Sequence, residues 1–284
     1  MEIRVLGALG VQVCGASVVP SAPKPRQVLA LLALRADQVV PAGVLADELW
    51  SGHPPRSART TVQTYVLQLR DMIDRALGRR QDTGEACGAK DVLVTSAGGY
   101  LLNSGGGLVD LQEFDRLAGL GYRAMDGGDF PLAARQLGEA LGLWRGPAFA
   151  DVPIGGQLTI EAKRLEETRL CALDQRIEAD LRLGRHRVLL AELTVLVDRY
   201  RTHESLHGQY MIALHRSGRR GEALEAYQRL RNTLVRELGM EPSAGLRRLQ
   251  RSILLANPDR PESDRAAGPA DPTPPRTTRL TRVG

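Results

Sequence analysis

The first hundred residues begin with short apolar runs and then change to helical spacing. Residues 2–19 read "EIRVLGALGVQVCGASVV", in which apolar groups occur in short runs between glycines. This pattern predicts a small antiparallel sheet with tight turns. After Pro23 and Pro25, the stretch "RQVLALLALRADQVV" places its apolar residues at helical spacing and predicts one helix.

A helix-turn-helix pattern follows. The stretch "PAGVLADELW" (41–50) predicts a short helix with its proline near the first turn, and the paired prolines of "SGHPPRS" (51–57) predict a loop. Ser57 is placed to cap the long helix of "SARTTVQTYVLQLRDMIDRAL" (57–77). The segment "DVLVTSAGGYLLN" (91–103) predicts a hairpin around a glycine turn. A small antiparallel sheet, three helices and a C-terminal hairpin together predict an α+β winged helix-turn-helix domain over residues 1–103.

Residues 104–257 show helical periodicity and almost no strand pattern. "LGRHRVLLAELTVL" begins at Leu183, a similar "SGRRGEALEAYQRL" begins 34 residues later at Ser217, and a looser copy begins at Gly127. A period of 34 residues is typical of tetratricopeptide arrays, whose helices bury their faces by stacking. We therefore expect an all-α tetratricopeptide-like domain. The tail, 258–284, has too few apolar groups to offset its ordering entropy and is expected to be disordered.

The long helix has an apolar side and an unusual polar side. With Val66 at its centre, the apolar side collects Val62, Leu69 and Ile73. Threonine is less favourable than alanine in a helix by up to about 0.7 kcal/mol, so helix propensity does not explain a group of threonines near the start of this helix. A helix that lies in the major groove of DNA gives these threonines a role, because threonine offers a hydroxyl and a methyl group to base edges and glutamine can pair with adenine. The alternative is a solvated, threonine-rich face. The polar side carries Thr60, Thr61, Thr64, Gln68, Asp71 and Arg75.

The positive charge is concentrated near the same helix. The net charge of +5 is only weak evidence for an anionic partner, and residues 1–103 carry 11 basic against 9 acidic residues. Within residues 56–80, however, six arginines face two aspartates, a local charge of +4. The charge therefore favours a nucleic-acid partner at this segment alone.

Other classes of function find little support in the sequence. No apolar run is long enough to cross a membrane, and no nucleotide-binding, hydrolase or zinc-protease motif occurs. His203 and His207 are four residues apart but have no evident third ligand. Cys14, Cys87 and Cys171 are expected to be buried thiols in a reducing cytoplasm. We therefore expect a cytoplasmic protein that is not an enzyme and has no cofactor, metal or membrane partner.

The chain resembles a known family. The stretches "PKPRQVLALLALRADQVVPAGVLADELWSGHPPRSARTTVQTYVLQLRDMI", "VTSAGGYLL" and "YRTHESLHGQYMIALHRSGRRGEALEAYQRLRNTLVRELGMEPS" resemble the antibiotic regulatory transcriptional activators of actinobacteria. The resemblance covers roughly residues 1–256. It implies an OmpR-type winged helix followed by a bacterial transcriptional activator domain. It also implies binding to direct-repeat promoter sites as a head-to-tail pair, and recruitment of RNA polymerase with its sigma factor to a secondary-metabolite gene cluster.

The resemblance also assigns roles to particular residues. Thr64 and Gln68 fall at base-reading positions, and Arg70 falls at a phosphate position although it lies nearer the core side of the helix. The loop 51–57 corresponds to a polymerase-contact segment, and the wing falls on 95–100. The full expected DNA-binding set is Arg59, Thr60, Thr61, Thr64, Gln68, Arg70, Arg75, Thr95, Ser96 and Tyr100, and the expected polymerase-contact residues are Ser51, His53 and Arg56.

Two departures from the family pattern alter the expectation. Relatives commonly read "YVSRLR" where this chain reads "YVLQLR", so Gln68 replaces an arginine suited to guanine. Ser96 and Ala97 stand where relatives tend to carry an arginine before the wing glycines. Either the DNA site is shifted toward adenine opposite Gln68, or DNA is held more weakly with help from a partner, and we favour the shifted site. The rival function is a helical-repeat interaction scaffold whose degenerate winged helix binds only protein.

Overall fold

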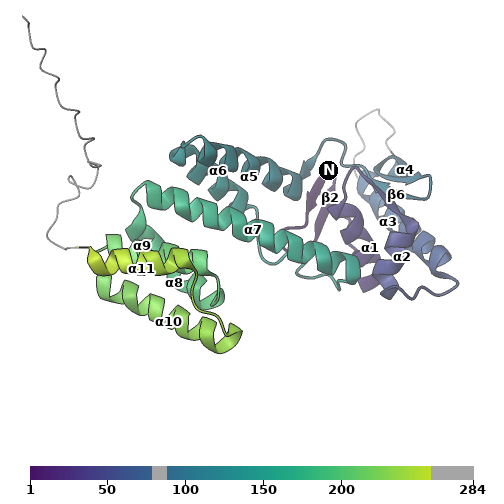
Figure 1. Ribbon diagram of the computed structural model, residues 1–284. Helices are drawn as coiled ribbons and strands as arrows, with labels where there is room; N and C mark the ends of the chain where they lie inside the picture. The colour runs from purple at the N-terminus through teal and green to yellow at the C-terminus, as the bar shows by residue number, and fades with distance from the viewer. Residues whose placement is uncertain (79–87, 257–284) are drawn as a thin grey trace, which may run out of the picture. The chain divides into compact units, whose positions relative to one another are not determined.

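The computed structural model describes residues 1–78 and 88–256. The chain divides into two compact units, residues 1–200 and the residues from Arg201 onward. The first unit contains two small sheets and the helices up to α8 (His186–Arg199), and the second is helical over its described part. Figure 1 shows these elements in chain order from purple to yellow.

The N-terminal sheet contains the predicted antiparallel strands and one further strand. Strands β1, β2 and β3 pair antiparallel, as expected from the glycine-separated runs. The fourth strand, β7, pairs parallel with β1, with Val109 opposite Ile3. The sequence pattern does not predict β7, because a two-residue strand is too short to show alternation. The sheet has the order β3-β2-β1-β7, formed by Ala16–Ser17, Gly10–Val13, Glu2–Arg4 and Leu108–Val109.

Three helices pack beside this sheet to form the core of the winged part. They are α1, α2 and α3, and α3 buries the predicted stripe of Val62, Val66, Leu69 and Ile73, each 1% exposed. The prediction of one helix through "RQVLALLALRADQVV" is wrong at its C-terminal end. Helix α1 ends at Leu34, and the final valines enter a strand, because pairing with the wing competes successfully with helix continuation. The helix bounds are Pro23–Leu34, Ala42–Trp50 and Ala58–Leu77.

The wing is a three-stranded sheet of order β4-β6-β5. The predicted hairpin is confirmed, and a short unpredicted helix, α4, precedes it. Its turn requires glycine: Gly98 has φ of +79°, and a Cβ at Gly99 would lie 2.2 Å from the carbonyl oxygen of Val40. The elements are β4 Val39–Pro41, α4 Ala89–Val92, β5 Leu93–Ser96 and β6 Gly99–Leu102.

A left-handed residue turns the chain from α1 into the wing. Asp37 has φ of +66°, and its carboxylate accepts hydrogen bonds from the Ser104 backbone N and Oγ, both at 2.7 Å. Partial burial acts to raise the pKa of Asp37, but hydrogen bonds from Ser104 and Gln112 together outweigh it and hold the pKa below its ordinary value. This carboxylate therefore ties the turn to the linker that follows the wing.

The predicted side-chain cap of α3 is wrong, although its position is right. Ser57 occupies the N-cap position, but its side chain accepts no hydrogen bond from α3. Its carbonyl oxygen instead accepts from the backbone N and the Oγ1 of Thr61, at 2.9 and 3.0 Å. The first turn of α3 is thus closed by the backbone and by a threonine of the helix itself.

The helical part repeats one kind of turn three times, as the sequence repeat predicted. Gly128, Gly184 and Gly218 have φ of +74°, +75° and +81°. In each turn the next residue donates its N–H to the carbonyl five residues earlier, at 2.9 to 3.0 Å, which is a feature of the Schellman motif. The helices are α5 Asp110–Asp126, α6 Phe130–Gly142, α7 Gly156–Arg182 and α8 His186–Arg199 in the first unit, and α9 Glu204–Arg216, α10 Arg220–Leu238 and α11 Ala244–Leu255 in the second.

The winged part and helices α5 to α7 share one apolar core. A single cluster of buried residues extends from Ile3 to Ala172, and Phe114 packs edge-on against Trp144 within it, with 5.6 Å between the ring centroids. The backbone also crosses this junction, since Arg145 and Phe149 donate N–H groups to carbonyls of the β1–β2 turn. The residues on both sides of position 103 therefore bury apolar surface together.

The expectation of buried thiols is wrong for two of the three cysteines. Cys14 and Cys171 are both exposed and free. Cys14 lies in the turn between β2 and β3 with a φ of +49°, so its side chain is outside the apolar core. Cys87 and the predicted disordered tail lie outside the described residues.

Candidate nucleic-acid interface

The outward side of α3 begins with an exposed set of polar residues. Thr60, Thr64 and Gln68 are exposed, and neither Thr60 nor Gln68 has a side-chain hydrogen bond to another described residue. The Thr64 hydroxyl donates to the carbonyl of Thr60 at 3.0 Å, so in this conformation its oxygen faces the surroundings as an acceptor. Thr61 is half-buried and donates its hydroxyl to Ser57. The expected base-reading residues thus share one exposed face, with a donor and acceptor at Gln68 and an acceptor at Thr64.

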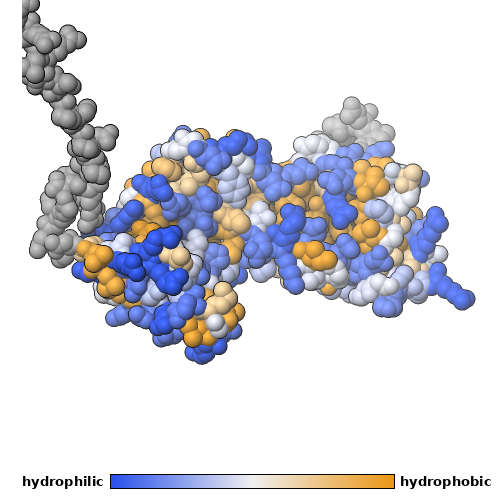
Figure 2. Space-filling model, in the orientation of Figure 1, coloured by the Kyte–Doolittle hydropathy of each residue, from blue (hydrophilic) through white to orange (hydrophobic). Residues whose placement is uncertain are grey.

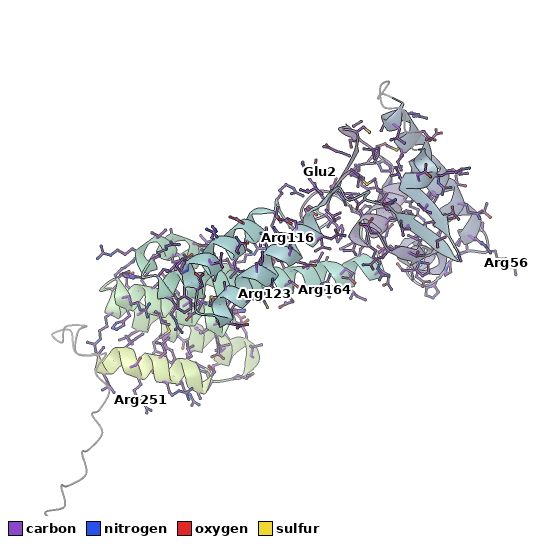
Figure 3. All side chains as sticks on the ribbon, turned by 90° about the horizontal axis from the view of Figure 1, so that it is seen from above. Glu2, Arg56, Arg116, Arg123, Arg164 and Arg251 are labelled. Atoms are coloured by element: carbon purple, nitrogen blue, oxygen red, sulfur yellow. The ribbon has the colours of Figure 1, made fainter. Side chains whose placement is uncertain are left out.

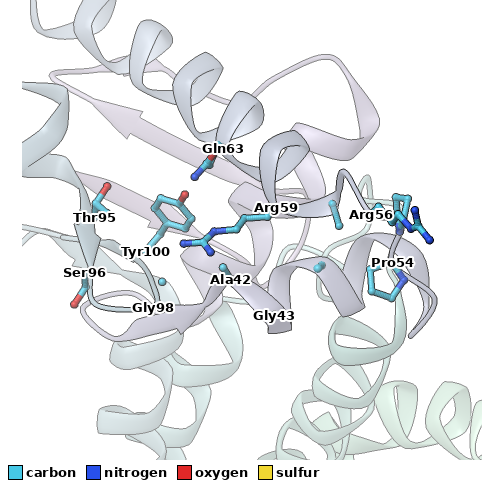
Figure 4. Close-up of a pocket in the computed structure, with 14 residues that line it drawn as sticks. Ala42, Gly43, Pro54, Arg56, Arg59, Gln63, Thr95, Ser96, Gly98 and Tyr100 are labelled. Carbon is cyan, nitrogen blue, oxygen red and sulfur yellow. The ribbon is translucent and has the colours of Figure 1, made fainter.

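A groove separates this face from the wing. It encloses about 550 Å³ between the start of α2, the loop before α3, the first turns of α3 and the wing turn. In Figure 4 the Arg59 side chain extends into this groove toward Tyr100. Arg59 forms no hydrogen bond or ion pair with another described residue, so its guanidinium is available to an anion. A phosphate is the anion that a guanidinium fork binds well.

The other two arginines of the predicted set already have partners within the domain. Arg70 donates from Nε and Nη2 to the carbonyl of Leu93, at 3.0 and 2.7 Å, and from Nη2 to Thr95 Oγ1 at 2.8 Å. Arg75 pairs with Asp71 at 2.7 Å, with both side chains exposed. Arg70 therefore fastens α3 to the wing, and Arg75 offsets the one acid in the middle of the outward face.

The predicted wing residues lie close to the N-terminal half of α3. Thr95 and Tyr100 stand opposite each other in the β5–β6 ladder, and Ser96 precedes the turn. All three line the groove, and in Figure 4 the Tyr100 ring lies nearest to Arg59 and Gln63. Tyr100 is only 9% exposed, so its ring is mainly a wall of the groove.

The loop between α2 and α3 presents the residues expected to contact polymerase. Ser51, His53 and Arg56 are exposed, and Ser51 has a left-handed φ of +52° that ends α2. The His53 ring lies 3.2 Å from the Ser51 carbonyl oxygen. Arg56 projects from the outer end of this part of the ribbon in Figure 3 and forms no bond with another described residue.

Two residues of the face were not singled out from the sequence. Gln63 is exposed and lines the groove, and Leu67 is 63% exposed between Thr64 and Gln68. A wheel that recorded apolar residues outside the core stripe would have found Leu67. On the face drawn in Figure 2, hydrophobic and hydrophilic residues are interspersed.

Among residues 1–78 and 88–256, no group of three or more histidine, cysteine or acidic side chains is placed to hold a metal ion. His203 instead accepts a hydrogen bond from the Leu206 N–H at the start of α9. Over the same ranges, no helix has the length and apolar character needed to span a bilayer.

Comparison with known proteins decides the family. Residues 16–83 match the model of the transcriptional regulatory protein C-terminal family, and residues 109–254 match the bacterial transcriptional activator domain. Regulatory protein DnrI of Streptomyces peucetius is 52% identical over 258 residues, which span 91% of this chain and 93% of DnrI. The chain belongs to the antibiotic regulatory transcriptional activator family.

Further relatives extend the comparison. Regulatory protein AfsR of Streptomyces coelicolor is 36% identical over 91% of this chain but only 24% of AfsR. A solved structure of Mycobacterium tuberculosis EmbR in complex with a low affinity phosphopeptide matches with a TM-score of 0.79 and 32% identity, over 89% of this chain and 64% of EmbR. These relatives are named as regulatory proteins. The expected winged helix-turn-helix followed by a tetratricopeptide-like helical domain is confirmed, and the regulator is a transcriptional activator of this family.

Proposed function

We propose that this regulator binds double-stranded DNA in a sequence-specific manner at direct-repeat promoter sites. There it recruits RNA polymerase with its sigma factor to an antibiotic or other secondary-metabolite gene cluster. The observation that carries the proposal is the exposed outward face of α3, where the Gln68 amide and the Thr60 hydroxyl have no partner among the described residues. The regulator acts without a cofactor, on DNA in the cytoplasm and nucleoid.

The shape of α3 suits a major groove. Its 20 residues span roughly 30 Å, at about 1.5 Å per residue. The unpartnered side chains lie in its first turn, at Thr60, and near its middle, at Gln68. The N-terminal turns of a recognition helix are the part that approaches base edges. Thr64 and Gln68 are assigned to bases, and Gln68 favours adenine because an amide pairs bidentately with its N6 and N7.

Phosphate contacts come from the groove beside α3. Arg59, Thr60 and the half-buried Thr61 are assigned to backbone phosphates at the start of the helix, where the N-terminal N–H groups also attract anions. The wing residues Thr95, Ser96 and Tyr100 border the same groove. Arg70 acts by holding the wing against α3, and Arg75 approaches phosphate only when Asp71 releases it.

The exposed loop before α3 is assigned to polymerase. Arg56→Ala is expected to leave affinity for DNA unchanged and to reduce transcription from a cognate promoter in a purified system. A parallel loss of DNA binding and transcription would place Arg56 in the DNA interface instead. Ser51 and His53 belong to the same proposed contact.

A head-to-tail pair on direct repeats supplies cooperative binding. Two half-sites in tandem should bind two copies with higher affinity than two independent half-sites would, whereas two inverted half-sites should show no such gain in affinity. Equal affinity per half-site in both arrangements would contradict the paired arrangement and leave single-site recognition intact.

Random-site selection followed by a salt titration tests the proposal as a whole. The purified chain is expected to enrich one sequence from a random duplex pool and to lose affinity for it steeply as salt rises, because counterions are released from phosphates. A protein-interaction scaffold with a degenerate winged helix would enrich no sequence and bind DNA only weakly through its arginines. That outcome would overturn the proposed function.

A further inference from the structure

Leu67 is an exposed apolar residue in the middle of the proposed reading face. In the described part of the first 103 residues, the large apolar side chains that are exposed are Val39 at 42% and Leu67 at 63%. Leu67 follows Thr60 by seven residues and Thr64 by three, so these residues share one side of α3. The proposed function assigns that side to DNA.

The arginines that follow Leu67 along α3 are held elsewhere. Arg70, one turn further along α3, is bonded to the Leu93 carbonyl and Thr95. Arg75 is paired with Asp71. Arginine stems often cover neighbouring apolar groups, but these two are anchored by their guanidinium groups to other partners. The isobutyl group of Leu67 therefore stays open to a partner from outside the domain.

A leucine can recognise only an apolar feature of a base pair. In the major groove the apolar group that distinguishes one base from the others is the 5-methyl group of thymine, since the other distinguishing groups are hydrogen-bond donors or acceptors. An adenine bound by Gln68 is paired with a thymine whose methyl group projects into the same groove. Leu67 is adjacent to Gln68 in the chain, so both can meet one A·T pair or two neighbouring pairs.

We propose that Leu67 is a specificity-determining residue that reads thymine by packing on its 5-methyl group. The inference rests on the proposed function and deepens it, because it names the base feature that this chain reads beside Gln68. It also accounts for an exposed leucine on a face that is otherwise polar. Burial of a methyl group against Leu67 contributes only when thymine stands at that position.

Removal of the methyl group from DNA tests the contact directly. Each deoxythymidine of the selected site is replaced in turn by deoxyuridine, which differs only by that methyl group, and affinity is measured by titration. The wild-type chain is expected to lose about fourfold at one position, as for a buried methyl group. Leu67→Ala is expected to bind the thymidine and uridine duplexes equally at that position.

A matched variant separates this contact from a general loss. Leu108→Ala removes a leucine of comparable exposure, 51%, from β7 and should keep the wild-type response to deoxyuridine. Leu67→Ala should fold, because alanine is favourable in a helix and the residue is exposed. If Leu67→Ala keeps the methyl dependence, or if the wild type tolerates deoxyuridine everywhere while still selecting one sequence, the inference fails and the proposed function stands. If no sequence is selected, both fail.

Discussion

Glu48 near the end of α2 caps the first turn of α7, and its removal should loosen the junction between the winged part and the helices. The side chain is 2% exposed. One carboxylate oxygen accepts from the Gly155 N at 2.5 Å and the other from the N–H groups of Gln157 and Leu158 at 2.8 and 3.0 Å. Gln27 donates to the same carboxylate at 3.0 Å. A buried anion thus satisfies the free N–H groups of a helix from another element.

The expected loss follows from these contacts. Removal of an N-cap side chain costs about 1 kcal/mol, and loss of a hydrogen bond to a charged group in a buried site adds roughly 2 kcal/mol. Because Leu158 is fully buried, its N–H cannot readily turn to water. We expect Glu48→Ala to lower the free energy of unfolding by about 3 kcal/mol. For a unit of about 200 residues that corresponds to a Tm roughly 6 to 12 °C lower.

Thermal and urea unfolding of the full chain, followed by circular dichroism, measure this loss. Asp47→Ala is the matched control, since the neighbouring carboxylate is exposed and surface substitutions stay within about 0.5 kcal/mol. Glu48→Gln should fall between the two, because the amide keeps one acceptor oxygen and turns a donor toward donors. A Tm of Glu48→Ala equal to that of Asp47→Ala would refute the capping argument.

Four further predictions concern the reading helix, the shared core and acid stability. Gln68→Ala should cost about 1 to 3 kcal/mol at one base position and relax preference there, and an equal loss on all sequences would contradict base reading. Arg59→Ala should weaken all sequences alike and reduce the salt slope by about one unit, which titrations at several salt concentrations measure. Because residues 1–103 share an apolar core with helices α5 to α7, we expect a fragment of residues 1–200 to melt cooperatively and a fragment of residues 1–103 not to, and a cooperative melt of the shorter fragment would contradict this. Folding lowers the pKa of Asp37, so its contribution to the free energy of unfolding is present above the ordinary carboxyl pKa of about 3.9 and is lost as pH falls through the lowered value. The difference in unfolding free energy between the wild type and Asp37→Asn should therefore disappear in unfolding curves measured in acid.

The sequence by itself determined the elements that depend on local chemistry. The apolar stripe of α3, the proline-marked loop before it, the glycine turn of the wing and the recurring glycine turns of the helical repeats are all visible as patterns. The same patterns placed Thr64 and Gln68 on the outward side of α3, because helical periodicity fixes which residues oppose the buried stripe. The pattern does not identify the partner that binds this face, and DNA is our proposal for it.

Only the tertiary structure decided the features that join residues far apart in the chain. Val39–Pro41 becomes a strand because β6 lies beside it, and β7 exists only because β1 offers an edge. Arg70 proved to be held by the wing, and Glu48 to cap a helix that begins more than a hundred residues later. These contacts are set by the packing of separate elements into one core, and neither hydrophobic spacing nor local propensity carries information about which distant groups that packing brings together.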